Sequence, residues 1–455
     1  MKKACTVFAV CITLICLVSC NGYSAPRAAS RSGLAFRAFV SNPLFPNPFG
    51  GGSPAIEIVD ASKDQLSRFS ISLQSLGSSV NSAGMMAVSP KHDRTLIFSP
   101  GDNRLGIVDN AQEAVSLTIN LQRPSESFFV WTDNVTVFVA LPSLGIPGEL
   151  PGAVERIDIS TGSLTATIPV PGAHTVVPTP DGKAILVFSD NSDAVTLLTP
   201  SLIGTGTQSS AQIPCSSTQT AACLIAGSFD RPTFAVFNPS GTTAYILNCG
   251  QRCGGTNSGA CLTFTSCTTV SALDMTQTPP VQGNSTAVPA STVALLLGNN
   301  LYVAGTPVSP ADNSCAGVTT AATTCGRLTV VDVASMTAAA PVAITDGYHN
   351  RMQMGSNGQL FIGARDCTNV DVSGGEVRGC LSIVNAAGSI SQSSVVAPQD
   401  NGDVTGIEPI PNRNVVYVCE GGRLRIYDTA TDQLEKLANG PVIVGQAIDV
   451  KVVDF

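Results

Sequence analysis

The sequence has few charged side chains, few aromatic residues and very little histidine. Only 12% of its 455 residues are Asp, Glu, Lys or Arg, 5% are aromatic, and there are three His and one Trp. The net charge of −8 is spread thinly, which argues against nucleic acid as a partner. An apolar share of 44% excludes a disordered chain.

Helical periodicity is also missing from the chain beyond its N-terminal segment. The residues that are plentiful are Val, Thr, Ser, Gly and Pro, with 42 Gly and 29 Pro. This composition excludes a helical bundle or a coiled coil, which would be rich in Ala, Glu, Lys, Leu and Arg. It indicates an all-β protein of extracytoplasmic character.

The N-terminus has the pattern of an export signal. Two lysines precede an apolar run over residues 6–18, which is too short to span a bilayer. The run ends in Leu-Val-Ser-Cys20, which resembles the bacterial lipobox. The resemblance implies a cleaved signal peptide over residues 1–20 and a lipid on Cys20 that anchors the protein in the bacterial cell envelope. It favours the outer membrane and leaves the periplasmic or surface side open.

Residues 21–33 are polar and predict a flexible tether between the lipid and the folded domain. The alternatives to a lipoprotein are an ordinary signal peptide with a chance cysteine and an uncleaved anchor.

The remaining chain is built from one repeated unit. Eight similar segments, most of them containing two apolar residues followed by an Asp, recur roughly 40 to 75 residues apart: 57–63, 105–111, 154–160, 194–200, 270–276, 328–334, 381–387 and 424–430. A turn and a short apolar strand precede most copies, and another strand follows. Each unit therefore predicts four strands, and the recurring Asp predicts a side-chain cap on the following turn.

Four-stranded units repeated four to eight times are typical of a β-propeller. The final segment, 446–455, has no strand after it to pair with, and the first segment, 35–61, lacks an innermost strand. We therefore expect the last strand to complete the first blade and close the ring. The prediction is a single propeller over residues 34–455 with eight blades, or seven if the weak copy around 174–226 belongs to a neighbour.

Residues 154–200 resemble the YVTN-type propeller repeat, which is related to lactonase-like and quinoprotein amine dehydrogenase β-chain-like propellers. The Tyr-Val-Thr-Asn step itself is weakly kept, and its nearest counterpart is residues 245–248. The resemblance implies a propeller whose relatives are mostly binding or scaffold modules. The fold alone does not decide the function.

Eleven cysteines follow Cys20, and an exported chain is expected to pair them. Their positions within the repeat predict five pairs: Cys215–Cys223, Cys249–Cys267, Cys253–Cys261, Cys315–Cys325 and Cys367–Cys380. Cys419 is left on an apolar strand as a buried thiol. The Cys-Gly-Gln-Arg-Cys spacing, with no His nearby, does not suit zinc, so we predict no metal and no cofactor.

Propeller topology places the second-to-third-strand loops and the blade-to-blade loops on the same face. The long insertions are all of the first kind: 43–54, 142–152, 249–267, 305–325 and 366–380. Such a crowded face, braced by disulfides, suits recognition. At its central mouth, alignment of the repeats places six candidate ligand contacts for an anionic or sugar ligand: Glu126, His174, Arg231, His349, Asn350 and Arg351. Alternatively, these polar residues satisfy backbone groups of the loops.

Two classes of function remain. The first is a lipid-anchored, monomeric binding or scaffold propeller that holds a protein, peptide or glycan on its loop-rich face. The second is an enzyme of the lactonase-like or dehydrogenase-like kind, acting at the channel mouth. The sequence contains no GxSxG, HExxH or P-loop motif, so it nominates no catalytic residues and favours the first class.

Overall fold

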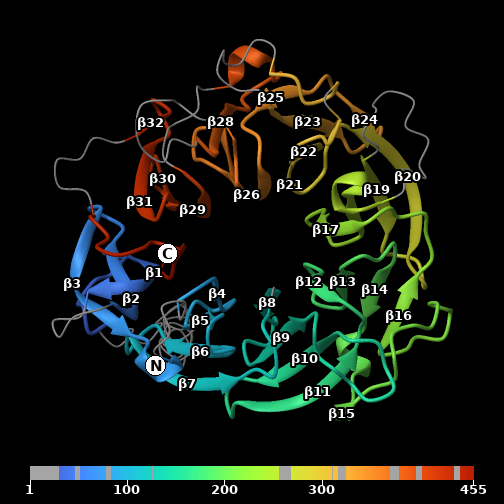
Figure 1. Ribbon diagram of the computed structural model, residues 1–455, viewed down its shortest axis with the longest axis horizontal. Helices are drawn as coiled ribbons and strands as arrows, with labels where there is room; N and C mark the ends of the chain where they lie inside the picture. The colour runs from blue at the N-terminus through green and yellow to red at the C-terminus, as the bar shows by residue number, and fades with distance from the viewer. Residues whose placement is uncertain are drawn as a thin grey trace, which may run out of the picture.

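Eight antiparallel β-sheets are arranged as blades around a central axis (Figure 1). The computed structural model describes residues 30–46, 52–77, 83–125, 127–255, 268–309, 311–315, 324–368, 379–395, 402–434 and 441–454. The predicted signal peptide, Cys20 and most of the predicted tether lie outside these residues. The predicted all-β propeller with eight blades is confirmed, and the seven-blade alternative is wrong.

Within a blade, the strands follow one another from the centre outward (Figure 1). Blade 1 contains β33 (Asp449–Val452), β1 (Arg37–Pro46), β2 (Gly52–Asp60) and β3 (Gln65–Ser72), and blade 2 contains β4 (Met86–Val88), β5 (Arg94–Ser99), β6 (Arg104–Asp109) and β7 (Ala114–Asn120). Blade 3 contains β8 (Ser127–Val130), β9 (Thr136–Leu141), β10 (Ala153–Asp158) and β11 (Ser163–Pro169). Blade 4 contains β12 (Ala173–Pro178), β13 (Ile185–Ser189), β14 (Val195–Leu198) and β16 (Ala222–Ile225). The short β15 (Gly206–Thr207) pairs in parallel with β11.

Blade 5 contains β17 (Pro232–Phe237), β18 (Thr243–Asn248), β19 (Thr268–Asp274) and β20 (Val281–Val288). Blade 6 contains β21 (Val293–Leu297), β22 (Asn300–Gly305) and β23 (Gly326–Asp332), with β24 (Thr337–Ala338) and β25 (Val342–Ile344) each paired with β23. Blade 7 contains β26 (Tyr348–Met354), β27 (Gln359–Arg365) and β28 (Leu381–Asn385), and blade 8 contains β29 (Val404–Pro409), β30 (Val415–Glu420), β31 (Arg423–Asp428) and β32 (Gln433–Leu434). In blade 7 the fourth position is represented by a bridge between Val384 and Val395. Four 3-10 turns complete the described elements: η1 (Gln74–Leu76), η2 (Pro200–Leu202), η3 (Gly250–Cys253) and η4 (Gln392–Ser394).

The C-terminal strand closes the ring as the sequence predicts. β33 pairs antiparallel with β1, from Ala38 opposite Val452 to Ser41 opposite Asp449. The two ends of the chain therefore share blade 1, and β1 has no open inner edge.

The hydrophobic core is divided among the contacts between blades. Each neighbouring pair of blades shares one cluster of buried apolar side chains, including the contact between blades 8 and 1. Between blades 3 and 4 this cluster contains Trp131, whose ring meets that of Phe138 edge-on at 5.5 Å. Because every blade is sandwiched between two others, its strands are apolar on both faces.

The structure contains three of the five predicted disulfides and contradicts the other two. The structure contains the disulfides Cys215–Cys223, Cys315–Cys325 and Cys367–Cys380. A fourth joins Cys249 to Cys253, so the predicted pairs Cys249–Cys267 and Cys253–Cys261 are wrong.

The physical reason is the 3-10 turn η3, which brings the Cα atoms of Cys249 and Cys253 to 5.6 Å, within disulfide range. Cys261 and Cys267 lie outside the described residues. Cys419 is a buried free thiol, as predicted. In the part of the chain that the structure describes, no helix is long and apolar enough to cross a membrane.

Candidate functional site

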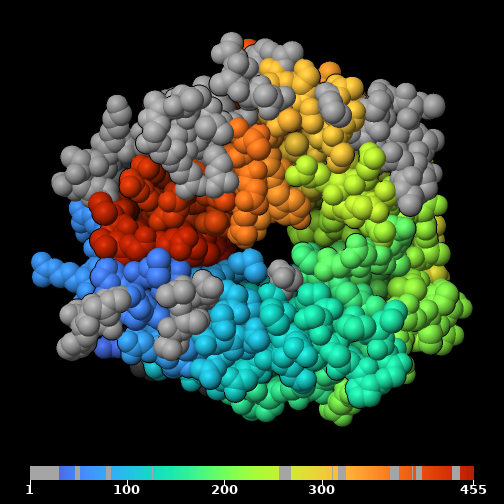
Figure 2. Space-filling view, viewed as in Figure 1, coloured from blue at the N-terminus to red at the C-terminus, as the bar shows by residue number. Residues whose placement is uncertain are grey.

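A cavity of about 1100 Å³ occupies the centre of the ring, where the surface is hollowed (Figure 2). Its wall includes the ends of second strands and the loops that follow them, at Ser189, Cys253 and Arg365. It also includes Ser125 and Arg231, which lie in connections between blades. Both kinds of loop therefore meet at this mouth, as propeller topology predicts, and we call it the loop-rich mouth.

Four of the six predicted ligand contacts line this cavity: His174, Arg231, Asn350 and Arg351. Each lies at or near the start of an innermost strand, which is the position that the repeat alignment uses. Nδ1 of the half-buried His174 lies 2.9 Å from the hydroxyl of Thr175. Glu126 lies outside the described residues.

Arg231 braces the mouth and has a partner for its charge. Its backbone is left-handed, with φ of 53°, and its amide donates to the carboxylate of Asp193 at 3.0 Å. Its guanidinium lies 3.6 Å from the same carboxylate and donates to the carbonyl of Gly254 at 3.3 Å. Asp193 thus offsets the positive charge of Arg231.

Arg351 has a different environment. Its Nε donates to the carbonyl of Thr405 in blade 8 at 3.1 Å, and its Nη1 donates to the carbonyl of Asn350 at 3.1 Å. These neutral acceptors fix the guanidinium without offsetting its charge. The positively charged guanidinium of Arg351 is therefore fixed in place at the cavity wall.

Arg365, which the sequence analysis did not single out, also lines the cavity. It is the last residue of β27, at the edge of the loop-rich mouth. Its Nε is buried and has no hydrogen-bond partner in the part of the chain that the structure describes. Burial, and then the nearby positive charge of Arg351, lower the pKa of Arg365. The available signal was its place at the end of a second strand, opposite the start of the innermost one.

His349 does not lie at the mouth. Its side chain is fully buried, and its ring packs so closely against Gly326 of blade 6 that a Cβ there would approach Cε1 to 2.7 Å. The irregularity in the β26–β27 register between His349 and Arg351 separates the directions of these two residues. Burial lowers the pKa of His349 to about 4, against the opposing effects of Thr345 and Asp346.

Within the same cavity, Lys451 forms a neutralised cluster. Its Nζ lies 3.4 Å from Asp449 and 3.6 Å from Glu408. Burial alone would lower the pKa of Lys451, but the two carboxylates outweigh it and raise the pKa. The other oxygen of Asp449 accepts the amide of Met86 at 2.8 Å, which ties blade 1 to blade 2.

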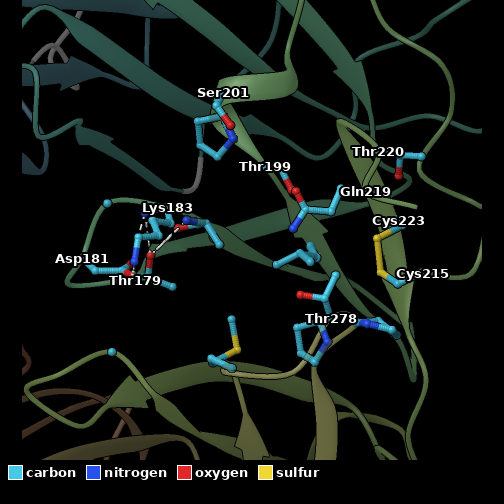
Figure 3. A pocket seen from close by; sticks show the side chains of 18 of the residues that line it. Thr179, Asp181, Lys183, Thr199, Ser201, Cys215, Gln219, Thr220, Cys223 and Thr278 are labelled. Carbon is cyan, nitrogen blue, oxygen red and sulfur yellow. Dashed lines mark hydrogen bonds and ion pairs between the residues drawn. A yellow bond between two sulfur atoms is a disulfide. The ribbon is translucent and has the colours of Figure 1, made fainter. Parts of the chain in front are cut away.

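A second cavity, of about 760 Å³, lies on the opposite face of blades 3 to 5. Figure 3 shows Thr179, Asp181 and Lys183 on one side of it and Gln219 and the Cys215–Cys223 disulfide on the other. Asp181 and Lys183 lie 3.0 Å apart and offset each other. The sequence analysis missed this groove, because it depends on how the 199–221 insertion folds back beside β14 and β16.

In the described ranges, no group of three or more His, Cys, Asp or Glu side chains is placed to hold a metal ion. The basic side chains that line the mouth are His174, Arg231, Arg351, Arg365 and Lys451, and the carboxylates that line it are those of Asp190, Asp366 and Asp449.

Comparison with known proteins supports the fold. No family model matches the chain, and no curated protein matches it. A solved structure described as dihydro-heme d1 dehydrogenase NirN in complex with DHE has a TM-score of 0.60 and 12% identity, covering 94% of this chain and 77% of that one. Hydrazine synthase of Kuenenia stuttgartiensis has a TM-score of 0.53 and 12% identity, covering 81% of this chain and 97% of the other.

The chain is a β-propeller. Its likeness to the periplasmic gluconolactonase PpgL of Pseudomonas aeruginosa is more distant, with a TM-score of 0.45 and 14% identity over 92% of this chain and 98% of that one. At these identities the neighbours show the fold of this propeller and nothing about its activity.

Proposed function

We propose that the protein is a lipid-anchored, extracytoplasmic propeller that binds a partner or ligand at its loop-rich mouth. The observation that carries the proposal is the cavity of about 1100 Å³ at that mouth, lined by held but incompletely neutralised arginines. Pockets with a few convergent polar groups are the usual place for a ligand.

The disulfides support the same face. Cys249–Cys253, Cys315–Cys325 and Cys367–Cys380 each lie in a second-to-third-strand connection. Cross-links in such loops reduce the conformational entropy lost when a ligand binds. In this proposal the lipid on Cys20 and the tether over 21–33 hold the propeller in the bacterial cell envelope as a monomer, and its partner is a protein, peptide or glycan.

The proposal is tested by photocrosslinking from two faces of the full-length lipoprotein in its native envelope. A photoreactive residue replaces Tyr348, which is exposed and lines the mouth, or Ser201, which lines the groove on the opposite face. We expect an adduct from position 348 and none from position 201. No adduct from position 348, or equal adducts from both, contradicts the proposal.

A second variant connects the crosslink to the loops. Replacing residues 249–267 by a short turn that joins β18 to β19 should abolish the adduct and leave the melting temperature nearly unchanged, because the blade strands remain intact. If the loop proves dispensable and His174→Ala removes a measurable hydrolase or dehydrogenase activity, the enzyme alternative replaces the binding proposal.

A further inference from the structure

We propose that Arg351 and Arg365 together form an oxyanion site that takes a carboxylate or phosphate group of a small ligand at the loop-rich mouth. The inference rests on the proposed function, because it names the ligand chemistry of the same cavity. It concerns one part of the cavity wall, where blade 7 faces blade 8.

Strand register places the two arginines on one face of blade 7. Arg351 of β26 lies opposite Gly363 of β27, and Arg365 lies two residues beyond Gly363. Side chains two residues apart on a strand project from the same face, so the two arginines are diagonal neighbours across the pair. Gly363 allows a close approach here, since a Cβ at this position would lie 2.4 Å from Cγ1 of Val404 in blade 8 and 3.3 Å from Cβ of Arg351.

Neither guanidinium has an ion-pair partner among the described residues. The hydrogen bonds of Arg351 go to two backbone carbonyls, and Nε of Arg365 is buried without a partner. The carboxylates around them have other contacts. Asp403 accepts the amide of Asp366 at 3.0 Å, and Asp449 binds Lys451 at 3.4 Å.

Arg37 shows what a neutralised buried arginine looks like in this protein. Its guanidinium lies 2.8 Å from Glu113 and 2.6 Å from Asp454. These partners outweigh the effect of burial and raise the pKa of Arg37. The pKa of Arg365 moves the other way, because burial and the like charge of Arg351 both lower it.

Two like charges held side by side in a half-buried wall cost free energy in the empty protein. A bound anion would remove that cost and supply acceptors for the remaining N–H donors. Arginine presents its donors as a planar fork that matches the two oxygens of a carboxylate or phosphate. The other cations of the cavity, Arg231 and Lys451, are offset by Asp193 and by Asp449 with Glu408. At blade 7, the charges of Asp403 and Asp366 raise the pKa of Arg365 but do not outweigh burial and the charge of Arg351.

The test measures binding of two anions to the lipid-free chain, residues 21–455. Inorganic phosphate and citrate are titrated separately by calorimetry and by thermal shift, at constant ionic strength with sodium chloride as the balance. The proteins compared are the natural sequence, Arg351→Gln, Arg365→Gln and Arg365→Lys. The control is Arg68→Gln, which removes an exposed arginine from the outermost strand of blade 1.

We expect saturable binding of at least one anion to the natural sequence and to R68Q, and affinity at least about tenfold weaker in R351Q and R365Q. R365K, which keeps the charge and loses the fork, should fall between them. Without anion, R365Q should melt at the same or a higher temperature than the natural sequence, because its loss removes a repulsion. An arginine with a purely structural role would lower it.

An equal stabilisation of all variants would be a general salt effect and would overturn the site, as would the absence of saturable binding of either anion. Preference for citrate or for phosphate identifies the carboxylate or the phosphate source. If neither anion binds but the adduct from position 348 persists, the proposed function stands and the oxyanion site falls. If an anion binds but no adduct forms at the mouth, the site stands and partner binding at this face falls.

Discussion

Arg37 and Asp454 are joined by two hydrogen bonds of 2.6 and 2.9 Å between residues 417 positions apart in the sequence. The same guanidinium also reaches Glu113 in the turn between β6 and β7 at 2.8 Å. All three side chains are almost fully buried. This cluster fastens β1, the C-terminal segment and blade 2 at the point where the ring closes.

Removing the cation from this cluster should destabilise the whole propeller. Arg37→Met removes the guanidinium that offsets the buried carboxylates of Asp454 and Glu113, and breaking a buried pair in this way typically costs about 3–5 kcal/mol. We expect a large fall in the midpoint of urea unfolding. Lys63→Met, which removes the exposed partner of Asp60, should change the unfolding free energy by less than about 1 kcal/mol. Equal effects of the two substitutions would show that the cluster is not essential to closure.

Deletion of residues 445–455 should abolish cooperative unfolding, because it removes β33 and exposes the inner edge of β1. Circular dichroism during heating, together with light scattering, measures this. A truncated protein that melts as sharply as the full chain would contradict the role of β33.

Glu155 predicts that stability falls as the pH rises from about 4.3 to 7. Burial raises its pKa to about 7, above the value of about 4.3 for an unfolded chain. The folded state therefore holds a proton that the unfolded state has lost, and the resulting stability is lost as the pH rises through 7. Glu155→Gln should be more stable than the natural sequence at pH 8, by up to roughly 3 kcal/mol, and lose that advantage near pH 4. Glu149→Gln, on an exposed loop, is the control.

His349 predicts the opposite trend. Its folded pKa of about 4 lies below the value of about 6.5 for an unfolded histidine. The unfolded chain therefore binds a proton first, and stability falls as the pH drops from about 6.5 towards 4. Between pH 7 and 5, His349→Gln should lose less stability than the natural sequence, by about 2 kcal/mol. His174→Gln at the mouth is the comparison, and identical pH profiles for all three proteins would refute the assignment.

The cysteine arrangement is checked by alkylation and peptide mapping. Cys419 is fully buried, and burial raises the pKa of its thiol, so it should react only after unfolding. Mapping should find Cys249 linked to Cys253. A link from Cys249 to Cys267 would restore the pairing that the repeat positions predict.

Mass spectrometry of the mature protein should show a lipid on Cys20, and Cys20→Ser should release the protein from the membrane.

The fold could be predicted from the sequence because most blades repeat the same local pattern of apolar strands and turn residues. The recurring Asp residues show this: Asp158 and Asp274 each accept the amide two residues later, at 2.8 and 2.9 Å, as caps of the following turn. Ring closure was also predictable, because an unpaired last strand and an incomplete first blade complement each other.

The site was predicted only in part. His174 and Arg351 were found because the start of an innermost strand is a repeat position. His349 was misplaced because a local register irregularity turns its ring into the contact with blade 6. Arg365 was missed because its importance comes from a neighbour on another strand and from the carboxylates that do not pair with it. Its place at the end of a second strand was a signal in the sequence, but the groups that surround it depend on packing.

The shared blade also makes closure of the ring depend on the synthesis of β33. β1 is translated long before its partner β33. Until β33 has been synthesised, the first sheet keeps an unpaired edge that is open to aggregation and proteolysis. A chain that stops before β33 therefore cannot form a slightly shorter closed propeller. Chains that stop before β33 therefore keep an open sheet edge and are exposed to proteolysis.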